Sequence, residues 1–409
     1  MTIQLQHSTL ISNRKVTITG SKSESNRLLI LKALYPNISI ENLSNSDDTQ
    51  VLNKALSTEN HIVNIHHAGT AMRFLTSYFA SKKGTDVILT GSQRMKERPI
   101  GLLVDALNAL GANISFVEND GFPPLKIQGQ ELLKSEVILK ANISSQFISS
   151  LMLIAPSLTN GLTIYLDGEI TSRPYINMTL KLLQDLEVDA RFDDQVITIK
   201  HKSQIPNSVE QKVIVESDWS SASYYYCLVA LSDIGSRITL QFYKENSLQG
   251  DSVLSNLYKS FGVETQFANH EIILTKASTH EDEVTFDLNN CPDIAQTIAV
   301  TALALGVNCD LFGLHTLKIK ETDRLVALQK EIEKLGGTIQ VTDNSLHLKA
   351  VKNLNANVAI ATYNDHRMAM AFAPLSLKVP IKIEDADVVS KSYPDFWKHL
   401  KSVGIQINE

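Results

Sequence analysis

A unit of about 75 residues recurs along the chain, and this repeat limits the possible folds more than any other feature of the sequence. Each copy contains a helical pattern that ends in Leu-Gly or a close variant, then a short alternating strand, a polar turn and a second strand. Glycine after the last apolar residue is typical of a helix that ends in the left-handed conformation, and alternating Val, Ile and Thr predict a half-buried strand. The helical patterns are expected to end at Gly111, Glu187, Gly262, Gly336 and Gly404.

A spacing of this size is too long for the common solenoid repeats, which have periods of about 20–50 residues. It indicates a small α/β module that is used about six times, with the stretch VLNKALSTENHIVNI, from Val51, as a weaker sixth copy. Such a module buries one helix face and one sheet face, so several copies must share a core. The polar stretch 201–212 is the best candidate for a linker near the middle of the chain. We therefore expect two similar lobes with a cleft between them, where binding sites often form.

Composition narrows the class of protein. A chain of 409 residues is long enough for two or three domains at roughly 100–200 residues each. The net charge of -6 argues against nucleic acid or an anionic membrane as a partner, since both require a basic surface. The N-terminus lacks the apolar core of a signal peptide, and no apolar run reaches the ~18 residues of a membrane span, which predicts a cytoplasmic protein. Three widely spaced cysteines suit neither a disulfide framework nor a CxxC metal site and are expected to be reduced and buried: Cys227, Cys291 and Cys309.

Chemistry is expected in the segments that the repeat does not explain. The first is TGSKSESNR, residues 19–27, where Gly20 breaks a strand and either serine beside Lys22 can cap the following helix. Free backbone N–H groups at a helix start, with Lys22 and Arg27 nearby, form a natural anion site. From these residues alone, a well-capped core helix is an equally good interpretation.

Two further segments combine cations with a helix start. In HAGTAMRFL, residues 67–75, Gly69 opens an apolar helix that bears Arg73 on its first turn. In SQRMKERPIG, residues 92–101, three cations precede Pro99, which is expected to begin another helix. Taken alone, a solvated basic loop is the better interpretation of this second segment. Its cations are Arg94, Lys96 and Arg98.

Carboxylates lie among these cations. NCPDIAQT, residues 290–297, sets Asp293 at the start of an apolar helix, where the helix dipole favours an acidic residue by about 0.3–1 kcal/mol. KIKETDRL, residues 318–325, begins another helical pattern, in which Glu321 and Arg324 are neighbours at i and i+3. Asp293 and Glu321 are therefore candidate acid and base groups for proton transfer. Solvated charges or support of the helix start are the expected roles of Lys318 and Asp323.

Similar junctions recur in SSQF, TSRPY, YNDHRMAM and KSYPD, at residues 144–147, 171–175, 363–370 and 391–395. Together these segments place at least eight Lys or Arg at turn-to-helix junctions of a chain whose overall balance is acidic. Such a concentration indicates an anionic ligand with more than one charged group, most simply phosphate plus carboxylate.

As a set, the segments are recognisable. Ten motifs occur in order: GSKSESNR, AGTAMR, RMKERPIG, SSQF, SRPY, SDWSSASYYY, PDIAQT, KETDRL, YNDHRMAM and SKSYPDFW. With these motifs the chain resembles, over about residues 15–400, the EPSP synthase family of 3-phosphoshikimate 1-carboxyvinyltransferases, which are enolpyruvyl transferases. The resemblance implies an inside-out α/β barrel with two lobes, each of three βαβαββ-type modules. The implied lobes are residues 1–20 plus 213–409 and residues 21–212, with the active site in the cleft between them.

The resemblance also implies two substrates and the residues that bind them. Phosphoenolpyruvate would be bound by Lys22, Gly69, Arg94, Gln146, Arg324, Arg367 and Lys391. Shikimate 3-phosphate would be bound by Lys22, Ser23, Arg27, Ser144, Ser145, Gln146, Ser172, Tyr175, Asp293 and Lys320.

In the reaction of this family, the 5-hydroxyl of shikimate 3-phosphate adds to C2 of phosphoenolpyruvate while C3 gains a proton, and the tetrahedral intermediate then loses phosphate. By resemblance, Asp293 is the base for the hydroxyl, Glu321 carries the proton to and from C3, and Lys22 is the cation at the bridging phosphate oxygen. No metal or organic cofactor is implied, and a monomer is expected. Because clustered cations repel one another in an empty site, we expect the lobes to close only when ligand binds.

The sequence departs from the family in places. Many members read GNAGTAMRP, whereas this chain has His66 and His67 before Ala68, and Phe74 after Arg73. Thr316 stands where an asparagine that contacts shikimate 3-phosphate is common. The response to inhibitors and the affinity for phosphoenolpyruvate therefore do not follow from the resemblance.

Two alternative functions stay open on the sequence. The related enolpyruvyl transferase that acts on UDP-N-acetylglucosamine usually carries a cysteine in the loop before Arg-Pro, and SQRMKERP contains none. A non-catalytic anion-binding protein would have little reason to keep Lys22, Asp293 and Glu321 together. Both alternatives are therefore weaker than the shikimate enzyme.

Overall fold

The computed structural model describes residues 1–141, 144–170, 173–202 and 211–408. It divides into two compact units. Unit 1 consists of residues 1–20 and 216–409, and unit 2 of residues 21–215. The return to unit 1 therefore follows Val215, three residues beyond the boundary expected from the sequence, and most of the expected linker 201–212 lies outside the described residues.

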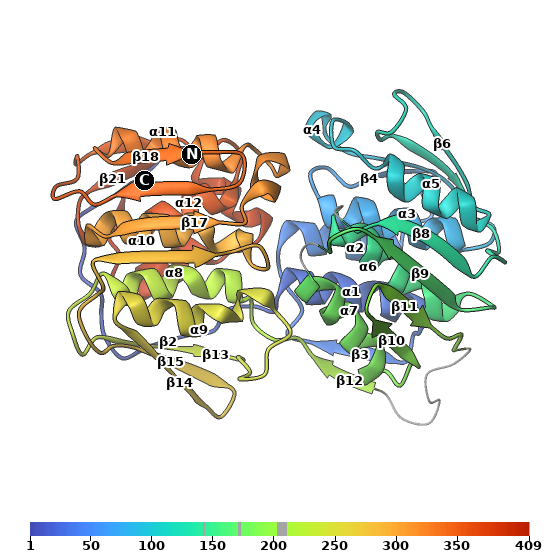
Figure 1. Cartoon of the computed structure of the whole chain (residues 1–409), viewed down its shortest axis with the longest axis horizontal. Coiled ribbons are helices and arrows are strands. Elements are labelled where there is room, and N and C mark those ends of the chain that lie inside the picture. Colours follow the sequence, from blue (N-terminus) through green and yellow to red (C-terminus); the bar gives the residue numbers. More distant parts are fainter. Residues whose placement is uncertain (142–143, 171–172, 203–210, 409) are drawn as a thin grey trace. The chain divides into compact units, whose positions relative to one another are not determined.

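Unit 2 contains the helices α1 (Lys22–Leu34), α2 (Asp47–Leu56), α3 (Gly69–Ser81), α4 (Gln93–Lys96), α5 (Gly101–Leu110), α6 (Ser145–Ile154) and α7 (Arg173–Asp185) (Figure 1). Its strands are β3 (Ile38–Glu41), β4 (Ile62–Asn64), β5 (Asp86–Thr90), β6 (Asn113–Phe116), β7 (Leu125–Gln128), β8 (Glu136–Lys140), β9 (Leu162–Asp167), β10 (Ala190–Asp193), β11 (Val196–Ile199) and β12 (Gln211–Ile214).

Unit 1 contains the helices α8 (Trp219–Ala230), α9 (Leu254–Leu257), α10 (Ala295–Leu305), α11 (Arg324–Lys334), α12 (His366–Phe372) and α13 (Phe396–Ser402). Its strands are β1 (Ile3–Leu5), β2 (Arg14–Val16), β13 (Arg237–Gln241), β14 (Val263–Ala268), β15 (Glu271–Lys276), β16 (Glu283–Asp287), β17 (Asn308–Phe312), β18 (Thr338–Val341), β19 (Leu346–Lys349), β20 (Val358–Ile360), β21 (Ile381–Ile383) and β22 (Ile407–Asn408). The 3-10 turns of unit 1 include η3 (Tyr258–Phe261), η4 (Pro292–Ile294), η5 (His315–Ile319) and η7 (Ala386–Lys391).

The described strands form six sheets, three in each unit. Five sheets share one strand pattern, in which a parallel pair is extended by two antiparallel strands, as in β4-β5-β7-β6. The other four with this pattern are β10-β11-β9-β8, β14-β15-β13-β2, β16-β17-β19-β18 and β20-β21-β1-β22. The remaining sheet is the parallel pair β12-β3. The expected βαβαββ module is therefore present in both units.

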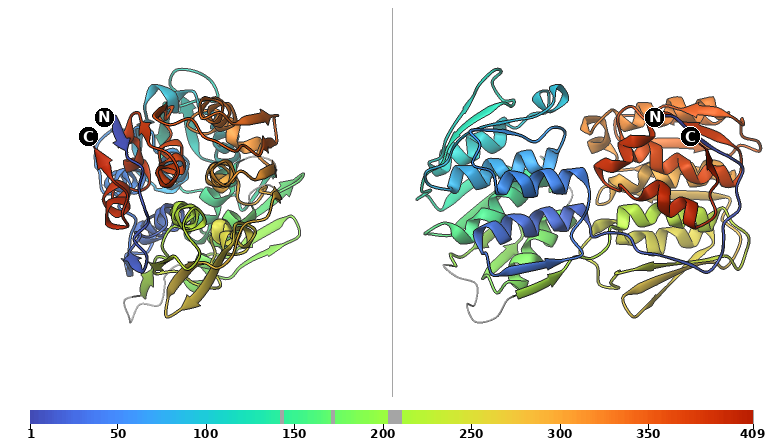
Figure 2. Two further views of the ribbon diagram at one scale, coloured as in Figure 1. Left: turned by 90° about the vertical axis from the view of Figure 1, so that its left-hand side faces the viewer. Right: turned by 180° about the vertical axis from the view of Figure 1, so that it is seen from behind.

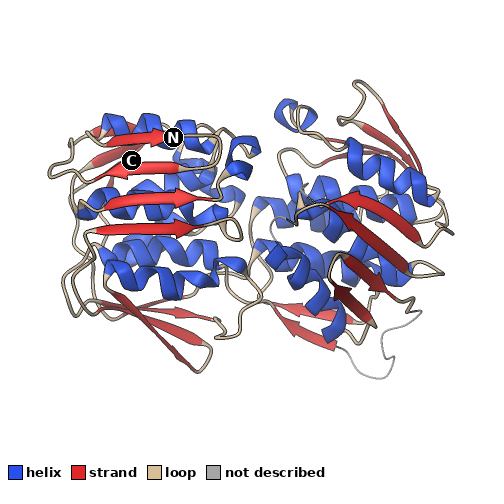
Figure 3. Cartoon of the chain, viewed as in Figure 1, coloured by secondary structure: helices blue, strands red, loops and turns tan. Residues whose placement is uncertain are grey.

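In each unit the sheets lie toward the outside and helices fill the middle (Figure 3). Every residue of α3 except Ser81 is buried, and so is every residue of α8 except Ser220. A helix that is apolar all round is typical of a core position. The outer helices α5 and α11 instead bury one face. This arrangement matches the inside-out barrel that was expected, and the three cysteines are free and buried, as predicted.

The ends of the repeated helical patterns adopt the left-handed conformation that the sequence predicts. The backbone φ angles are 106° at Gly111, 59° at Glu187, 74° at Gly262, 89° at Gly336 and 106° at Gly404. The prediction of a weaker sixth copy from Val51 is wrong about its second strand. Its strand β4 leads into α3 rather than into a second strand of a hairpin, and it pairs with β5 instead.

Two helix starts differ from the sequence prediction. The helix after Pro99 begins at Gly101. The segment KIKETDRL is not helical throughout, because Asp323 caps α11 by accepting the N–H groups of Leu325 and Val326, both at 3.2 Å. The helix therefore begins at Arg324, and Lys320 and Glu321 precede it. The support of the helix start by Asp323 is confirmed.

The two chain ends lie side by side in unit 1 (Figure 2). Strand β1 pairs with β21 on one side and with β22 on the other. The first strand of the chain thus completes the module formed by the last residues. No helix within the described ranges is both long and apolar enough to span a membrane.

Gly262→Ala is expected to destabilise unit 1 more than Gly336→Ala. Both changes force a side chain into the left-handed conformation, at about 1–2 kcal/mol. Only at Gly262 would the new Cβ lie 2.1 Å from a backbone oxygen, that of Ser278, whereas at Gly336 the nearest atom would be 3.5 Å away. Thermal unfolding of the two variants measures the difference, and equal losses of stability would contradict the steric argument.

Candidate active site

A buried arginine at the start of α11 holds three carboxylates in unit 1. The side chain of Arg324 is only 2% exposed. Its Nε donates to Oδ2 of Asp365 at 2.6 Å, and its Nη1 donates to Oδ1 of Asp293 at 2.8 Å. Its Nη2 donates to Oε2 of Glu321 at 2.9 Å. The guanidinium therefore joins three segments that are distant in sequence.

Asp293 in turn contacts two further cations. Nη2 of Arg367 lies 3.2 Å from its Oδ2, and Nζ of Lys320 lies 3.5 Å from its Oδ1. These residues form one network of charges, called the Arg324 cluster below: Asp293, Lys320, Glu321, Arg324, Asp365 and Arg367. The network brings together five residues predicted from the sequence and adds Asp365.

The cluster keeps both of its central groups ionised. Burial by itself raises the pKa of Asp293, but the cations Arg367, Lys320 and Arg324 outweigh burial and hold this pKa well below its ordinary value. Burial likewise lowers the pKa of Arg324, and the three carboxylates around it reverse the effect and raise that pKa. Asp293 is therefore a carboxylate at neutral pH and, in this arrangement, a weak base.

The loop before α12 carries a second set of contacts. Asp365 caps α12 by accepting the backbone N–H of Arg367 at 2.8 Å. The ammonium of Lys391, at the end of η7, donates to the backbone oxygen of Asn364 at 2.6 Å. This loop is therefore shared by three cations predicted to bind phosphoenolpyruvate. Arg367 belongs to residues 364–367, whereas Arg324 and Lys391 contact them.

The start of α8 reaches the same cluster. Nη2 of Arg367 donates to the hydroxyl of Ser220 at 3.2 Å, and this hydroxyl donates to the carboxylate of Asp251. Burial, followed by the negative charge of Asp293, raises the pKa of Asp251 to about 6. The N-terminal ends of α8, α11 and α12, and η4 directly before α10, therefore meet in unit 1 (Figure 1).

In unit 2 a second group of charges joins the starts of three helices. Nζ of Lys22, the first residue of α1, lies 3.2 Å from Oδ2 of Asp48 in the first turn of α2. Nε2 of His67, just before α3, lies 3.8 Å from Oδ1 of the same aspartate. We call Lys22, Asp48 and His67 the Lys22 cluster.

Helix α6 meets α3 at the same end. The amide of Gln146 donates to the hydroxyl of Thr70 at 3.2 Å. Ser144 occupies the N-cap position of α6 and accepts the N–H of Gln146 at 3.4 Å, as its sequence pattern predicts, and Ser145 is buried. The positive ends of α1, α2, α3 and α6 are thereby gathered, which favours an anion.

Arg27 lies one turn further along α1 and is bound by neutral groups. Its side chain donates to the hydroxyls of Thr179 and Ser149 at 2.7 and 3.0 Å. It also donates to the backbone oxygens of Ser23 and Tyr175, at 2.7 and 3.3 Å. Burial lowers the pKa of Arg27 to about 10, and it stays a cation. The structure thus places Ser23, Arg27 and Tyr175 together.

The basic segment before α5 divides into exposed and engaged residues. Arg94 is exposed and lies 3.1 Å from Oε2 of Glu97. Arg98 instead packs on the start of α3, where a Cβ added to Gly69 would lie 2.5 Å from its Nη1. The buried Arg73 donates to the backbone oxygen of Gly69 at 3.1 Å, and burial, together with Arg98, lowers its pKa. The interpretation as a solvated loop is therefore right for Arg94 and wrong for Arg98.

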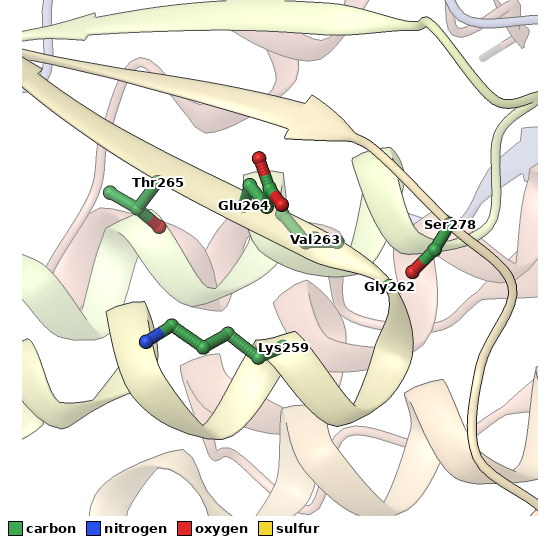
Figure 4. Close-up of a pocket in the computed structure, with 6 residues that line it drawn as sticks. All are labelled: Lys259, Gly262, Val263, Glu264, Thr265 and Ser278. Carbon is green, nitrogen blue, oxygen red and sulfur yellow. The ribbon is translucent and has the colours of Figure 1, made fainter.

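Two other features of unit 1 lie outside these clusters. A cavity of about 310 Å³ opens between η3 and strand β14 and is lined by Lys259, Gly262, Val263, Glu264, Thr265 and Ser278 (Figure 4). A hydrogen-bonded chain runs from Ser345 to His347 at 2.8 Å and on to Asp310 at 2.7 Å. The order resembles a catalytic triad, but Ser345 is only 7% exposed and its N–H is bound by the hydroxyl of Thr342.

Comparison with known proteins identifies the family of the chain. The EPSP synthase (3-phosphoshikimate 1-carboxyvinyltransferase) family matches residues 50–400. A 3-phosphoshikimate 1-carboxyvinyltransferase of Bacteroides fragilis is 45% identical over 399 residues, which are 96% of this chain and 95% of that protein. The chain belongs to the EPSP synthase family. A second member, from Colwellia psychrerythraea, is 35% identical over 420 residues, covering 96% of this chain and 97% of its own.

Solved structures of EPSP synthases and related transferases share the fold. The EPSP synthase of Acinetobacter baumannii superposes with a TM-score of 0.79 at 19% identity and covers both chains completely. The enolpyruvyl transferase NikO of Streptomyces tendae gives a TM-score of 0.74 at 14% identity and covers 100% of this chain and 98% of its own. These likenesses establish the two-lobed α/β architecture.

The departures from the EPSP synthase pattern have local explanations. With Phe74 in place of the family's proline, α3 begins at Gly69. The ring of Phe74 lies 5.4 Å from the guanidinium carbon of Arg27. His67 contacts Asp48, so it adds a titratable group to the Lys22 cluster. The hydroxyl of Thr316 is buried and has no hydrogen-bond partner among the described residues. The predicted site residue Ser172 lies outside the described residues.

The sequence did not reveal several participants in the two clusters. Asp48 and Asp365 contact the predicted cations directly but lie in patterns that indicate only a helix start. Ser220 contacts Arg367 directly although 147 residues separate them, and Asp251 reaches Arg367 through the hydroxyl of Ser220. For Asp365 and Ser220 a signal was present, since they lie within the motifs YNDHRMAM and SDWSSASYYY.

Arg324→Gln is expected to lower the stability of unit 1 at pH 7 by about 3–5 kcal/mol, because it leaves buried carboxylates without their cation. The loss should shrink toward pH 3. The depressed pKa of Asp293 stabilises the fold above its unfolded pKa of about 3.9, and this contribution disappears as the pH falls.

Thermal unfolding of the full chain between pH 7 and pH 3 measures this effect. Arg94→Gln is the matched control, since Arg94 is exposed and is expected to change stability by less than about 0.5 kcal/mol. A loss in Arg324→Gln that is small, or the same at every pH, would contradict the role of the cluster.

Proposed function

We propose that this chain transfers the enolpyruvyl group of phosphoenolpyruvate to the 5-hydroxyl of shikimate 3-phosphate, as a 3-phosphoshikimate 1-carboxyvinyltransferase. The products are 5-enolpyruvylshikimate 3-phosphate and phosphate, and the reaction belongs to the shikimate pathway. The observation that carries the proposal is the Arg324 cluster, where the predicted proton-transfer groups Asp293 and Glu321 share one guanidinium.

Each cluster suits one part of the chemistry. The Lys22 cluster and the helix starts around it supply positive charge and backbone N–H groups for phosphate, with Gln146 and Ser144 beside them. The Arg324 cluster supplies cations for phosphoenolpyruvate together with two carboxylates for proton transfer. We propose that both clusters act on the same pair of substrates.

The low pKa of Asp293 explains how the base would be controlled. Without substrate, Arg367, Lys320 and Arg324 hold its negative charge and make it a weak base. Anionic substrates would share these cations, which weakens their hold on Asp293 and raises its pKa. Asp293 then becomes basic enough to accept the proton of the 5-hydroxyl only when the substrates are bound. Glu321, also held by Arg324, is the proposed proton carrier to and from C3.

Release of phosphate from phosphoenolpyruvate tests the function directly. We expect release with shikimate 3-phosphate and none with UDP-N-acetylglucosamine. Release only with the nucleotide sugar would assign the chain to the sister activity, and no release with either would favour a binding protein. A cytoplasmic location, a monomeric state and closure on binding stay predictions; the last is measured by small-angle scattering with and without shikimate 3-phosphate.

Asp293→Asn is expected to lower kcat by about 10²–10⁴-fold, the usual contribution of a general base. Asp343→Asn is the matched control, because Asp343 is exposed and contacts Lys318 outside the cluster. Turnover assays of both variants at neutral pH decide the matter. Near-normal turnover in Asp293→Asn would refute its role as the base.

A further inference from the structure

The loop that joins β20 to α12 holds an unusual conformation. Tyr363 and Asn364 both have positive φ, of 54° and 56°. Two successive side chains in the left-handed region persist only where the surroundings enforce that conformation, and such residues cluster at functional sites. The loop, residues 361–365, ends in Asp365, which binds Arg324 and caps α12.

One buried carboxylate binds the beginning of this loop. The side chain of Glu331 is 0% exposed. Its Oε1 accepts the hydroxyl of Tyr363 at 2.6 Å, and its Oε2 accepts the backbone N–H of Ala361 at 3.1 Å. Lys334 donates to the same Oε2 at 2.7 Å and also to the backbone oxygen of Ala359 at 3.2 Å.

Helix α11 therefore holds the loop at both ends. Glu331 follows Arg324 by seven residues, which places the two on one face of the helix, two turns apart. Glu331 binds residues 361 and 363, and Arg324 binds Asp365. Between these points lies Asn364, whose backbone oxygen accepts from Lys391.

We propose that Glu331 is a positioning residue for the phosphoenolpyruvate site, acting through its hydrogen bond to Tyr363 and its bond to the N–H of Ala361. By holding the loop in its left-handed turn, Glu331 fixes the cap of α12, the direction of Arg367 and the carbonyl that holds Lys391. It contacts neither substrate. The inference rests on the proposed function, because it concerns the cations assigned to phosphoenolpyruvate.

Two substitutions remove these bonds without removing a proposed substrate contact. E331Q removes the charge that Tyr363 and Lys334 contact, and its amide must either face the N–H of Ala361 or reverse the bond to Tyr363, whose hydroxyl then accepts, so the charge-assisted bonds to the loop are weakened. Y363F removes only the hydroxyl and keeps the ring. The matched control is E333Q, on the same helix, since Glu333 is exposed and its side chain accepts only from Gln329 among the hydrogen bonds that the structure describes.

Steady-state release of phosphate by the full chain is the first measurement. We expect the KM for phosphoenolpyruvate to rise about tenfold or more in E331Q and less in Y363F, with the KM for shikimate 3-phosphate within twofold of the unchanged protein. In the double variant the rise in the KM for phosphoenolpyruvate should be smaller than the product of the two single rises, because both changes act on the same hydrogen bond between residues 331 and 363. E333Q should behave like the unchanged protein.

Hydrogen exchange gives a second measurement that does not depend on turnover. Amides of residues 361–367 should exchange faster in E331Q and Y363F, while those of the Lys22 cluster keep their rates. A general loss of stability would instead speed exchange throughout unit 1 and raise both KM values together. If E331Q does not fold, Y363F decides the question.

The outcomes separate the two proposals. If the unchanged chain releases phosphate and both variants keep a KM for phosphoenolpyruvate within twofold of normal, the positioning role of Glu331 is wrong and the function stands. If the unchanged chain releases no phosphate, the proposed function fails, and the positioning role fails with it.

Discussion

The organisation of unit 1 depends on how a fully buried guanidinium is compensated. Arg324 carries a fixed fork of N–H donors, and three carboxylates from different segments meet it. Removing one partner of such a buried pair typically costs about 3–5 kcal/mol, so η4, the start of α11 and the loop before α12 are tied together by charge. The groups proposed to move protons are the same groups that hold the site in place. Structure and chemistry in this unit therefore cannot be changed independently.

In unit 2 the buried guanidinium of Arg27 is compensated mainly by neutral groups. Arg27 is buried among hydroxyls, backbone oxygens and an aromatic ring, and its pKa falls to about 10. Lys22 shares Asp48 with His67. The two clusters thus differ, since Lys22 and His67 contact the same carboxylate, whereas Arg324 contacts three. Under the proposed function, unit 2 would offer positive charge to phosphate, and unit 1 would surround its cations with groups that accept protons.

The fold was largely predictable because its signals are local. A residue that ends a helix in the left-handed conformation and the alternation of a half-buried strand can be read within a dozen residues, and even Glu187 adopts the predicted conformation. The partners of the cations were less predictable. Asp48 and Asp365 have the pattern of helix starts, and nothing in the linear sequence shows that Asp365 reaches Arg324 41 residues away. The start of α11 was misplaced because charge spacing alone does not reveal which aspartate caps the helix.

The pairing of β1 with β21 and β22 sets an order on synthesis. Residues 21–215 form a continuous unit, and every strand they need has been made once Val215 is reached, just past the middle of the chain. Unit 1 begins with residues that are made before all of unit 2, yet the sheet of β1 needs strands that end at Asn408. Strand β1 therefore stays without its partner strands while some 370 residues are added. Domains generally fold as whole units during synthesis, so unit 1 folds after unit 2. A nascent chain of this kind carries one finished unit and one open sheet edge until β21 and β22 have been made.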